Sequence, residues 1–169
     1  MLTNNLEKAF SYQINKELFS EYLYLSMQAY LKGIGLDGFA SWMNIQVQEE
    51  RAHAMGLFNY VYERGGKIEL EAIEKPKTQW ANVVELFREV LAHEQYVTSL
   101  INKLYDVAQE DKDRAAMLLL NWYIKEQVEE EDSAQAVLAK LELIGDDKCA
   151  LLALDKELGA RQFHAPQIK

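Results

Sequence analysis

Glutamates that interrupt apolar stripes are the residues of this sequence best suited to chemistry. Read in steps of three and four residues, the stretch over about residues 79–108 gives an apolar stripe with Glu94 inside it. The stretch over about residues 112–144 gives a second stripe, interrupted by Gln127 and Glu130. A carboxylate or amide on the buried face of a helix needs a partner, so these positions require an explanation.

Two further stripes carry acid near their middles. Glu17 lies in the stretch over about residues 5–33, and Glu50 and His53 lie in the stretch over about residues 37–65. Glu50 and His53 are spaced i, i+3, which places both side chains on one face of a helix, as metal ligands require. Such a pair is common by chance, and its weight comes from its central position.

The midpoints of the four stretches fall within about one turn of these polar residues. Antiparallel packing would therefore bring four carboxylates, one imidazole and one amide to the same height in a dry core. Buried carboxylates lose hydration and raise one another's pKa, and two divalent cations would balance four such charges. Oxygen-rich ligation with one imidazole suits iron or manganese better than a soft metal, with zinc as a competitor.

The ordinary explanation of a glutamate in an apolar stripe is a misjudged helical phase or a nearby lysine or arginine. That explanation serves for one residue, but four coincidences at one height are far rarer. Other metal-ligating side chains look less functional. His93 lies one residue off its stripe and His164 lies in a polar tail, so we expect both to be solvated. The single Cys149 excludes an internal disulfide or a thiolate metal cage.

Glycines and prolines divide the chain into the elements that must position these residues. We expect helices over about residues 5–33, 37–65, 79–108, 112–144 and 146–158. Asp37 is expected to cap the second helix, and the only long connection, from Lys67 to Thr78, contains Pro76. The other joints are short enough to force antiparallel neighbours.

These elements predict an all-α fold in a single domain over residues 1–169. Two helical hairpins joined by one crossover make a four-helix bundle, and a short fifth helix follows. The fifth stretch is more apolar than a loose tail needs to be, so we expect it to pack against a partner.

Composition limits the classes of function. The chain has 169 residues, 49% of them apolar, which is enough for a substantial core. Its 27 acidic against 18 basic residues give a net charge of −9, and such a surface repels phosphate, so we expect no nucleic-acid partner. The amino-terminal residues do not resemble a signal peptide and no apolar run could span a bilayer, so we expect a cytoplasmic protein without a membrane partner.

The polar residues of the four stripes together resemble bacterial non-haem ferritin, over essentially the whole chain. The resemblance is carried by Glu17, Tyr24, the run Glu49-Glu50-x-x-His53, Glu94 and Gln127-x-x-Glu130. It implies a ferritin-like four-helix bundle with a long crossover between the second and third helices and a short fifth carboxy-terminal helix.

Two departures from related families refine this resemblance. Bacterioferritin and rubrerythrin carry Glu-x-x-His where this chain has Gln127-x-x-Glu130, which implies a weaker second metal site. Arg51 occupies the position at which bacterioferritin places its axial methionine, so we expect no haem. The chain also lacks the cysteine-rich segment of rubrerythrin.

The resemblance implies a ligand role for five residues. Glu17, Glu50 and His53 would hold a first iron ion. Glu50 would bridge to a second iron ion, which Glu94 and Glu130 would hold.

Other roles follow from the same resemblance. Gln127 would hydrogen-bond near the second ion and bind oxygen or its products. Tyr24 would be an electron donor, or equally a core tyrosine bonded to a carboxylate. A third iron position would use the acidic residues that flank the ligands, for which a solvated acidic face is the simpler interpretation: Glu49, Glu126 and Glu129.

The function implied by the resemblance is iron storage and detoxification. The chain would be a ferroxidase that oxidises Fe(II) to Fe(III) with dioxygen or peroxide at a di-iron centre inside one subunit. Ferric oxide would then be deposited in the cavity of a 24-mer shell.

Three other classes remain open. A DNA-coating mini-ferritin would put its iron site between subunits, whereas these ligands lie within one bundle. A di-iron oxygenase would need a substrate pocket lined with small apolar residues, and the stripes here are filled with bulky ones. A helical interaction module without metal would leave the buried acids unexplained.

Overall fold

The computed structural model describes residues 2–168, which form five helices and no strand. Their bounds are α1 Asn4–Gly33, α2 Asp37–Glu63, α3 Val83–Glu110, α4 Arg114–Ile144 and α5 Lys148–Leu158. The all-α prediction is confirmed by these elements. Met1 and Lys169, the ends of the expected domain, lie outside the described residues. Within residues 2–168, no helix is long and apolar enough to cross a bilayer.

Side-chain caps fix where three of the long helices begin. Thr3 accepts a hydrogen bond from the N–H of Leu6 at the start of α1, and Asp113 accepts one from Ala116 at the start of α4. The third helix begins at Val83 rather than near residue 79, because Asn82 has an extended backbone and its side chain accepts from the N–H of Glu85. An asparagine cap outweighs the helix-compatible residues before it.

The second helix is capped from outside, by α5. The expected cap Asp37 makes no such bond: it is the first residue of α2 and its carboxylate is paired with Lys32 at 3.2 Å. Instead, the N–H of Phe39 donates to Asp155 Oδ1 at 2.9 Å. This bond requires close approach, and a Cβ at Gly38 would lie 1.6 Å from the backbone oxygen of Asp155.

Gly38→Ala is therefore expected to push α5 away from α2. The clash is with backbone, which cannot rotate aside, so we expect a loss of about 1–3 kcal/mol in the free energy of unfolding, measured by urea denaturation. Gly33→Ala is the matched control, because a Cβ there meets nothing within 4 Å. Equal stability of the two variants would contradict the contact.

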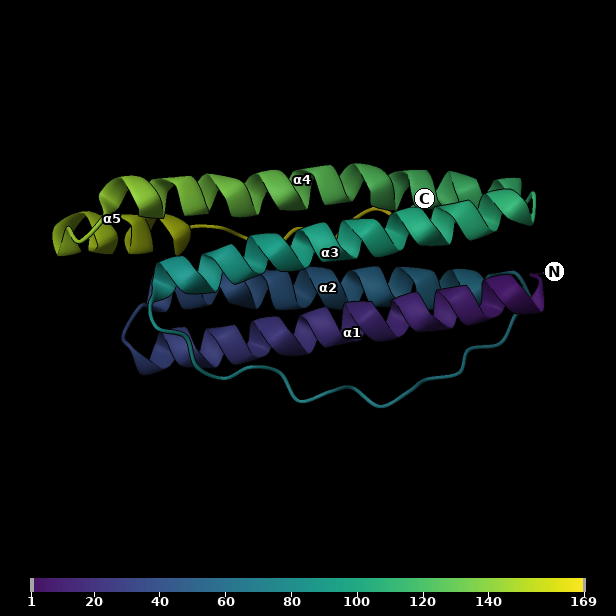
Figure 1. Cartoon of the computed structure of the whole chain (residues 1–169), viewed down its shortest axis with the longest axis horizontal. Helices are drawn as coiled ribbons and strands as arrows, with labels where there is room; N and C mark the ends of the chain where they lie inside the picture. The colour runs from purple at the N-terminus through teal and green to yellow at the C-terminus, as the bar shows by residue number, and fades with distance from the viewer. Residues whose placement is uncertain (1, 169) are drawn as a thin grey trace.

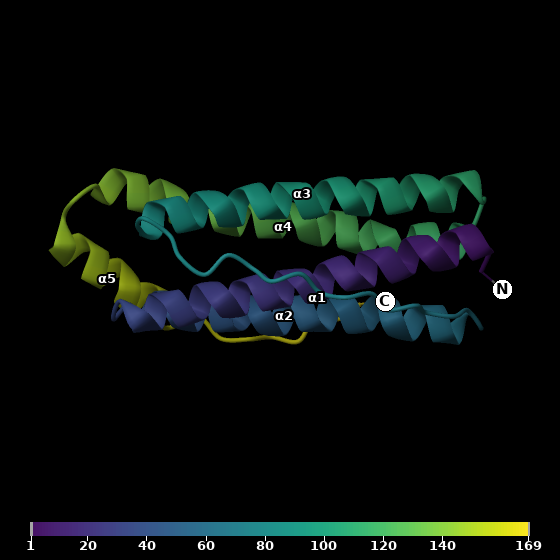
Figure 2. The same cartoon turned by 60° about the horizontal axis from the view of Figure 1, so that its bottom comes forward.

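The long helices form two antiparallel hairpins, α1 with α2 and α3 with α4, as Figure 1 shows. The connection between α2 and α3 crosses the length of the bundle and follows α1 in both views (Figures 1 and 2). Side chains of α1 hold it in place: Asn15 donates to the carbonyl of Glu71 at 3.0 Å and Tyr30 to that of Trp80 at 3.0 Å. The segment after α5 runs back along α2.

The core consists of two apolar clusters separated by a polar layer. The cluster at the α5 end includes Met27, Phe39 and Phe87. The cluster at the other end includes Phe10 and Leu57. Between them lie buried polar side chains from all four long helices: Gln13, Glu17, Gln46, Glu50, His53, Glu94, Gln127 and Glu130.

Candidate metal centre

The four long helices place six predicted site residues in the polar layer. Each helix contributes at its midpoint, so antiparallel packing brings the contributions to one height. All six side chains belong to residues that are at most 5% exposed: Glu17, Glu50, His53, Glu94, Gln127 and Glu130. The structure therefore brings together the acids that interrupt the apolar stripes.

The first half of the site is formed by Glu17, Glu50 and His53. One ligand atom of each lies within 4.8 Å of the other two, a spacing that fits a single metal ion. Among residues 2–168, Glu17 Oε2, Glu50 Oε2 and His53 Nε2 are buried without a hydrogen-bond partner. Buried polar atoms are almost always paired, so three orphans in one place indicate that a cation belongs there.

The second half of the site is formed by Glu94 and Glu130. Tyr24 donates its hydroxyl hydrogen to Glu94 Oε1, and Gln127 Nε2 donates to Glu94 Oε2 at 3.2 Å. Gln46 Nε2 donates to Glu130 Oε2 at 2.8 Å. Neutral donors therefore hold both oxygens of Glu94 and one oxygen of Glu130.

Crowding of acids shifts the pKa values of the layer. Burial, followed by the charges of Glu94 and Glu17, raises the pKa of Glu50 well above its usual range. Burial and the charge of Glu130 raise the pKa of Glu94 to about 8. Burial lowers the pKa of His53, but Glu126 and the other acids outweigh this effect and raise it to about 9. Without metal, the layer holds protons that metal ions would displace.

The three flanking acids lie in different surroundings. Glu126 Oε1 is 3.8 Å from the unpaired His53 Nε2, and Glu126, His53 and Glu130 form a second group with metal-ligand spacing. Glu49 is bound by Arg161 through both carboxylate oxygens, at 3.0 and 2.8 Å. Glu129 lies on the surface with its side chain 65% exposed.

The comparisons with known proteins decide the family. Residues 7–144 match the ferritin family, by its description a ferritin-like domain. The chain belongs to the ferritin family.

Similar ferritins match nearly the full length of the chain. It is 40% identical over 163 residues to the bacterial non-heme ferritin of Staphylococcus aureus strain USA300, covering 96% of this chain and 98% of that one. Among solved structures, a humanized archaeal ferritin is 49% identical with a TM-score of 0.96, covering 97% and 99% of the two chains. An open pore ferritin from Archaeoglobus fulgidus is 48% identical with a TM-score of 0.94, covering 96% and 99%. The resemblance inferred from the sequence is confirmed.

Aromatic residues line the site of this ferritin. Tyr24 is fully buried, and burial and the charge of Glu94 raise its pKa well above its usual range. Its hydroxyl is thus neutral and hydrogen-bonded to a carboxylate, as expected for a core tyrosine. The ring of Trp122 lies edge-on to that of His53, with centroids 5.7 Å apart.

The expectation that His93 is solvated was wrong. This residue of the ferritin chain is half-buried, with Nε2 2.8 Å from the hydroxyl of Ser20, and burial lowers its pKa to about 4. The connection between α2 and α3 covers this face of the bundle, which the helical stripe alone does not reveal. His164 is exposed, as expected.

Three residues near the ferritin site had no assigned role from the sequence. Gln13 donates to Glu17 Oε1 at 2.8 Å, and Gln46 donates to Glu130. Both amides lie on the stripes one turn from the ligands, so their position was the available signal. Arg161 had no such signal, because it lies beyond the last helix.

Proposed function

We propose that this ferritin stores and detoxifies iron, by oxidising Fe(II) to Fe(III) at the buried centre and keeping the product as ferric oxide. The observation that carries the proposal is the polar layer itself. Four carboxylates and one imidazole from four helices converge there, and three ligand atoms have no partner within the described chain. No other feature of the fold accounts for so many buried acids.

The proposed ligand set assigns each residue by its place in the layer. Glu17, Glu50 and His53 hold the first Fe(II), and their spacing of 4.8 Å or less supports this assignment. Glu94 and Glu130 hold the second. Glu50 bridges the two ions, since its charge is close to both Glu17 and Glu94. Two Fe(II) ions held side by side by these residues would supply two electrons to one oxidant molecule.

Neutral donors complete the proposed centre. Gln127 holds Glu94 and lies where dioxygen, peroxide or their products would bind beside the second ion. Tyr24, hydrogen-bonded to Glu94, is placed to give an electron and a proton to the same reaction. Four carboxylate charges match two divalent ions, so loading removes the repulsion that raises the pKa values of the empty layer.

A third iron position is proposed beside the centre. Glu126 faces His53 Nε2 and supports such a position, whereas Glu49 is engaged by Arg161 and Glu129 is open to solvent. The proposed use is transit of iron between the centre and the mineral.

The assembly is proposed to be a cytoplasmic 24-mer shell of single-domain subunits, without haem and without nucleic-acid or membrane partners. The bound position of α5 against α2 and the exposed Leu152, on a helix rich in leucine, support an interface at this end of the bundle. A shell supplies the cavity that mineral storage needs and that one bundle lacks.

The test is aerobic loading of the metal-free protein with excess Fe(II), followed by gel filtration and measurement of iron per chain. We expect a large particle that retains far more than the roughly three ions that ligand sites hold. Retention of only two or three ions in a small assembly would contradict storage and indicate a redox enzyme with the same centre.

A further inference from the structure

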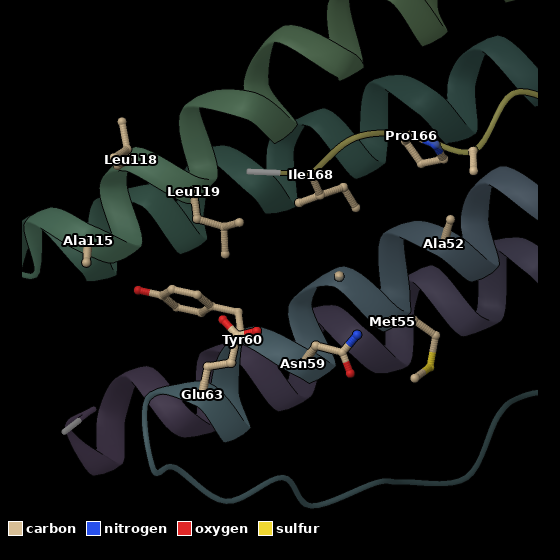
Figure 3. Close-up of a pocket in the computed structure, with 12 residues that line it drawn as sticks. Ala52, Met55, Asn59, Tyr60, Glu63, Ala115, Leu118, Leu119, Pro166 and Ile168 are labelled. Atoms are coloured by element: carbon tan, nitrogen blue, oxygen red, sulfur yellow. The ribbon is translucent and has the colours of Figure 1, made fainter.

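The segment after α5, residues 159–168, is attached to the bundle at two points. Arg161 binds side chains of α2 near the metal centre, and Ile168 packs farther along α2. Figure 3 shows the far end, where Pro166 and Ile168 lie between α2 and α4 and line a pocket together with Leu119 of α4. We call residues 159–168 the strap.

The far attachment of the strap is matched to a glycine. Gly56 lies inside α2 and has no need of a positive φ, yet a Cβ there would be 2.5 Å from Cδ1 of Ile168 and 2.6 Å from the hydroxyl of Tyr123. The missing side chain leaves the space that Ile168 fills. The strap is therefore packed into the bundle and does not simply trail from it.

The near attachment of the strap uses most of the Arg161 guanidinium. It donates to both oxygens of Glu49, at 3.0 and 2.8 Å, and to Gln46 Oε1, and it lies 5.0 Å from the centroid of the Trp42 ring. Gln46 in turn donates to Glu130. The side chain of Gln46 therefore links Arg161 to Glu130, a proposed iron ligand.

Arg161 lies beside a group of acidic residues and a buried imidazole nitrogen that could bind a metal cation. Glu126 and Glu130 lie around the Nε2 of His53, which is buried, without a partner among the described residues and 3.8 Å from Glu126. Glu49 is near enough to this group that the charges of Glu130 and His53 act on its carboxylate. Arg161 is the cation that the described chain brings to Glu49. A bidentate guanidinium-carboxylate pair that is mostly shielded from water is a strong interaction, so a metal ion cannot take Glu49 without displacing it.

We propose that Arg161 is a tethered cation that holds Glu49 in place of a third metal ion, so that the third position fills only when the strap releases it. This inference rests on the proposed function, because it assumes the two-metal centre beside Glu49. Two ions bind first, and the third competes with a guanidinium held nearby by the strap. Release of Arg161 also frees Gln46 and so loosens one hydrogen bond on Glu130.

The test is anaerobic equilibrium dialysis of the assembled, metal-free protein against Zn²⁺, a redox-inert probe. The wild-type chain is expected to bind two ions tightly and a third weakly. In Arg161→Gln the third ion should bind about tenfold more tightly or better, the size expected from the loss of a charge-assisted pair. Adding Glu49→Gln to this variant should abolish the gain.

Control variants separate this role from general effects of charge and folding. Arg88→Gln removes the same charge from an exposed pair with Glu142, whose atoms are 2.8 Å apart, and should leave the third affinity unchanged. Ile168→Ser loosens only the far attachment and should tighten third-ion binding by less than Arg161→Gln does. If Arg161→Gln disturbs assembly, Arg161→Lys keeps the charge without the fork and should give an intermediate affinity.

The outcomes are distinct. The role of Arg161 would be overturned if Arg161→Gln bound the third Zn²⁺ ion no more tightly than Arg88→Gln does. It would also be overturned if the tighter binding persisted after Glu49→Gln was added. Either result would leave the two-metal centre intact. Failure of the wild-type chain to bind the first two ions would instead overturn the proposed function.

Discussion

Glu50→Ala is expected to abolish fast Fe(II) oxidation while leaving the assembly intact. Glu50 is the proposed bridge, so its loss removes a ligand from both ions at once. We expect the initial rate at two Fe(II) per chain to fall by about 100-fold or more, measured from the absorbance of Fe(III). Assembly should survive because Glu50 Oε2 has no hydrogen-bond partner to lose in the described part of the chain and the residue lies inside one bundle.

The matched control for this variant is Glu63→Ala. It makes the same change on the same helix, at an exposed residue outside the polar layer. Its initial rate should equal that of the wild-type chain. An unchanged rate in Glu50→Ala, with normal particle size by gel filtration, would contradict the assignment of the site.

The metal-free protein is expected to lose stability as pH rises from about 6.5 to 8. Burial and Glu130 raise the pKa of Glu94 from 4.5 to about 8, so the folded chain keeps a proton that the unfolded chain has released. His53, whose pKa is raised from 6.5 to about 9, acts in the same direction. The free energy of unfolding should fall by about 1.4 kcal/mol per pH unit for each such group.

The lower limit of this pH window comes from His93. Burial lowers its pKa from 6.5 to about 4, so it contributes stability above pH 6.5 that is lost as pH falls toward 4. This loss opposes the gain from the carboxyl groups below pH 6.5, but it does not act above that value.

The prediction is checked by urea denaturation of the chelator-treated, metal-free protein at several pH values across this range. Glu94→Gln should flatten the slope, whereas Glu142→Gln, at an exposed pair, should not. Zn²⁺ should reverse the trend, since its binding strengthens as the ligands lose protons. A flat profile for the metal-free wild-type chain would show that the layer is not protonated in the folded state.

The ligand layer was predictable because helical periodicity is strict. Glu94 stands out because its neighbours on the same helix face are apolar, and Gln127 and Glu130 together interrupt the next stripe. The family resemblance added Tyr24 and gave Gln127 its role. Counting from glycines placed the ends of most helices within a few residues. Asn82 moved the start of α3 because one capping side chain decided between two acceptable starts.

Contacts between segments far apart in sequence were not predictable. Asp155 caps α2 across more than a hundred residues, and Arg161 reaches Glu49 from a segment without any periodic pattern. His93 is covered by the irregular connection from α2 to α3, whose path no stripe records. Periodicity determines which face of a helix is buried, but it does not say which loop or tail lies over the other faces.

The polar layer also separates the two apolar clusters of the bundle from each other. The clusters around Phe39 and Phe10 share no residue, and the layer between them is held by hydrogen bonds rather than by interlocking apolar side chains. Because the clusters share no residue, substitutions such as Met27→Leu in one and Leu57→Met in the other should change the free energy of unfolding additively. The residues of one cluster can therefore change, in evolution or by design, without compensating substitutions in the other, provided that the polar layer is left unchanged.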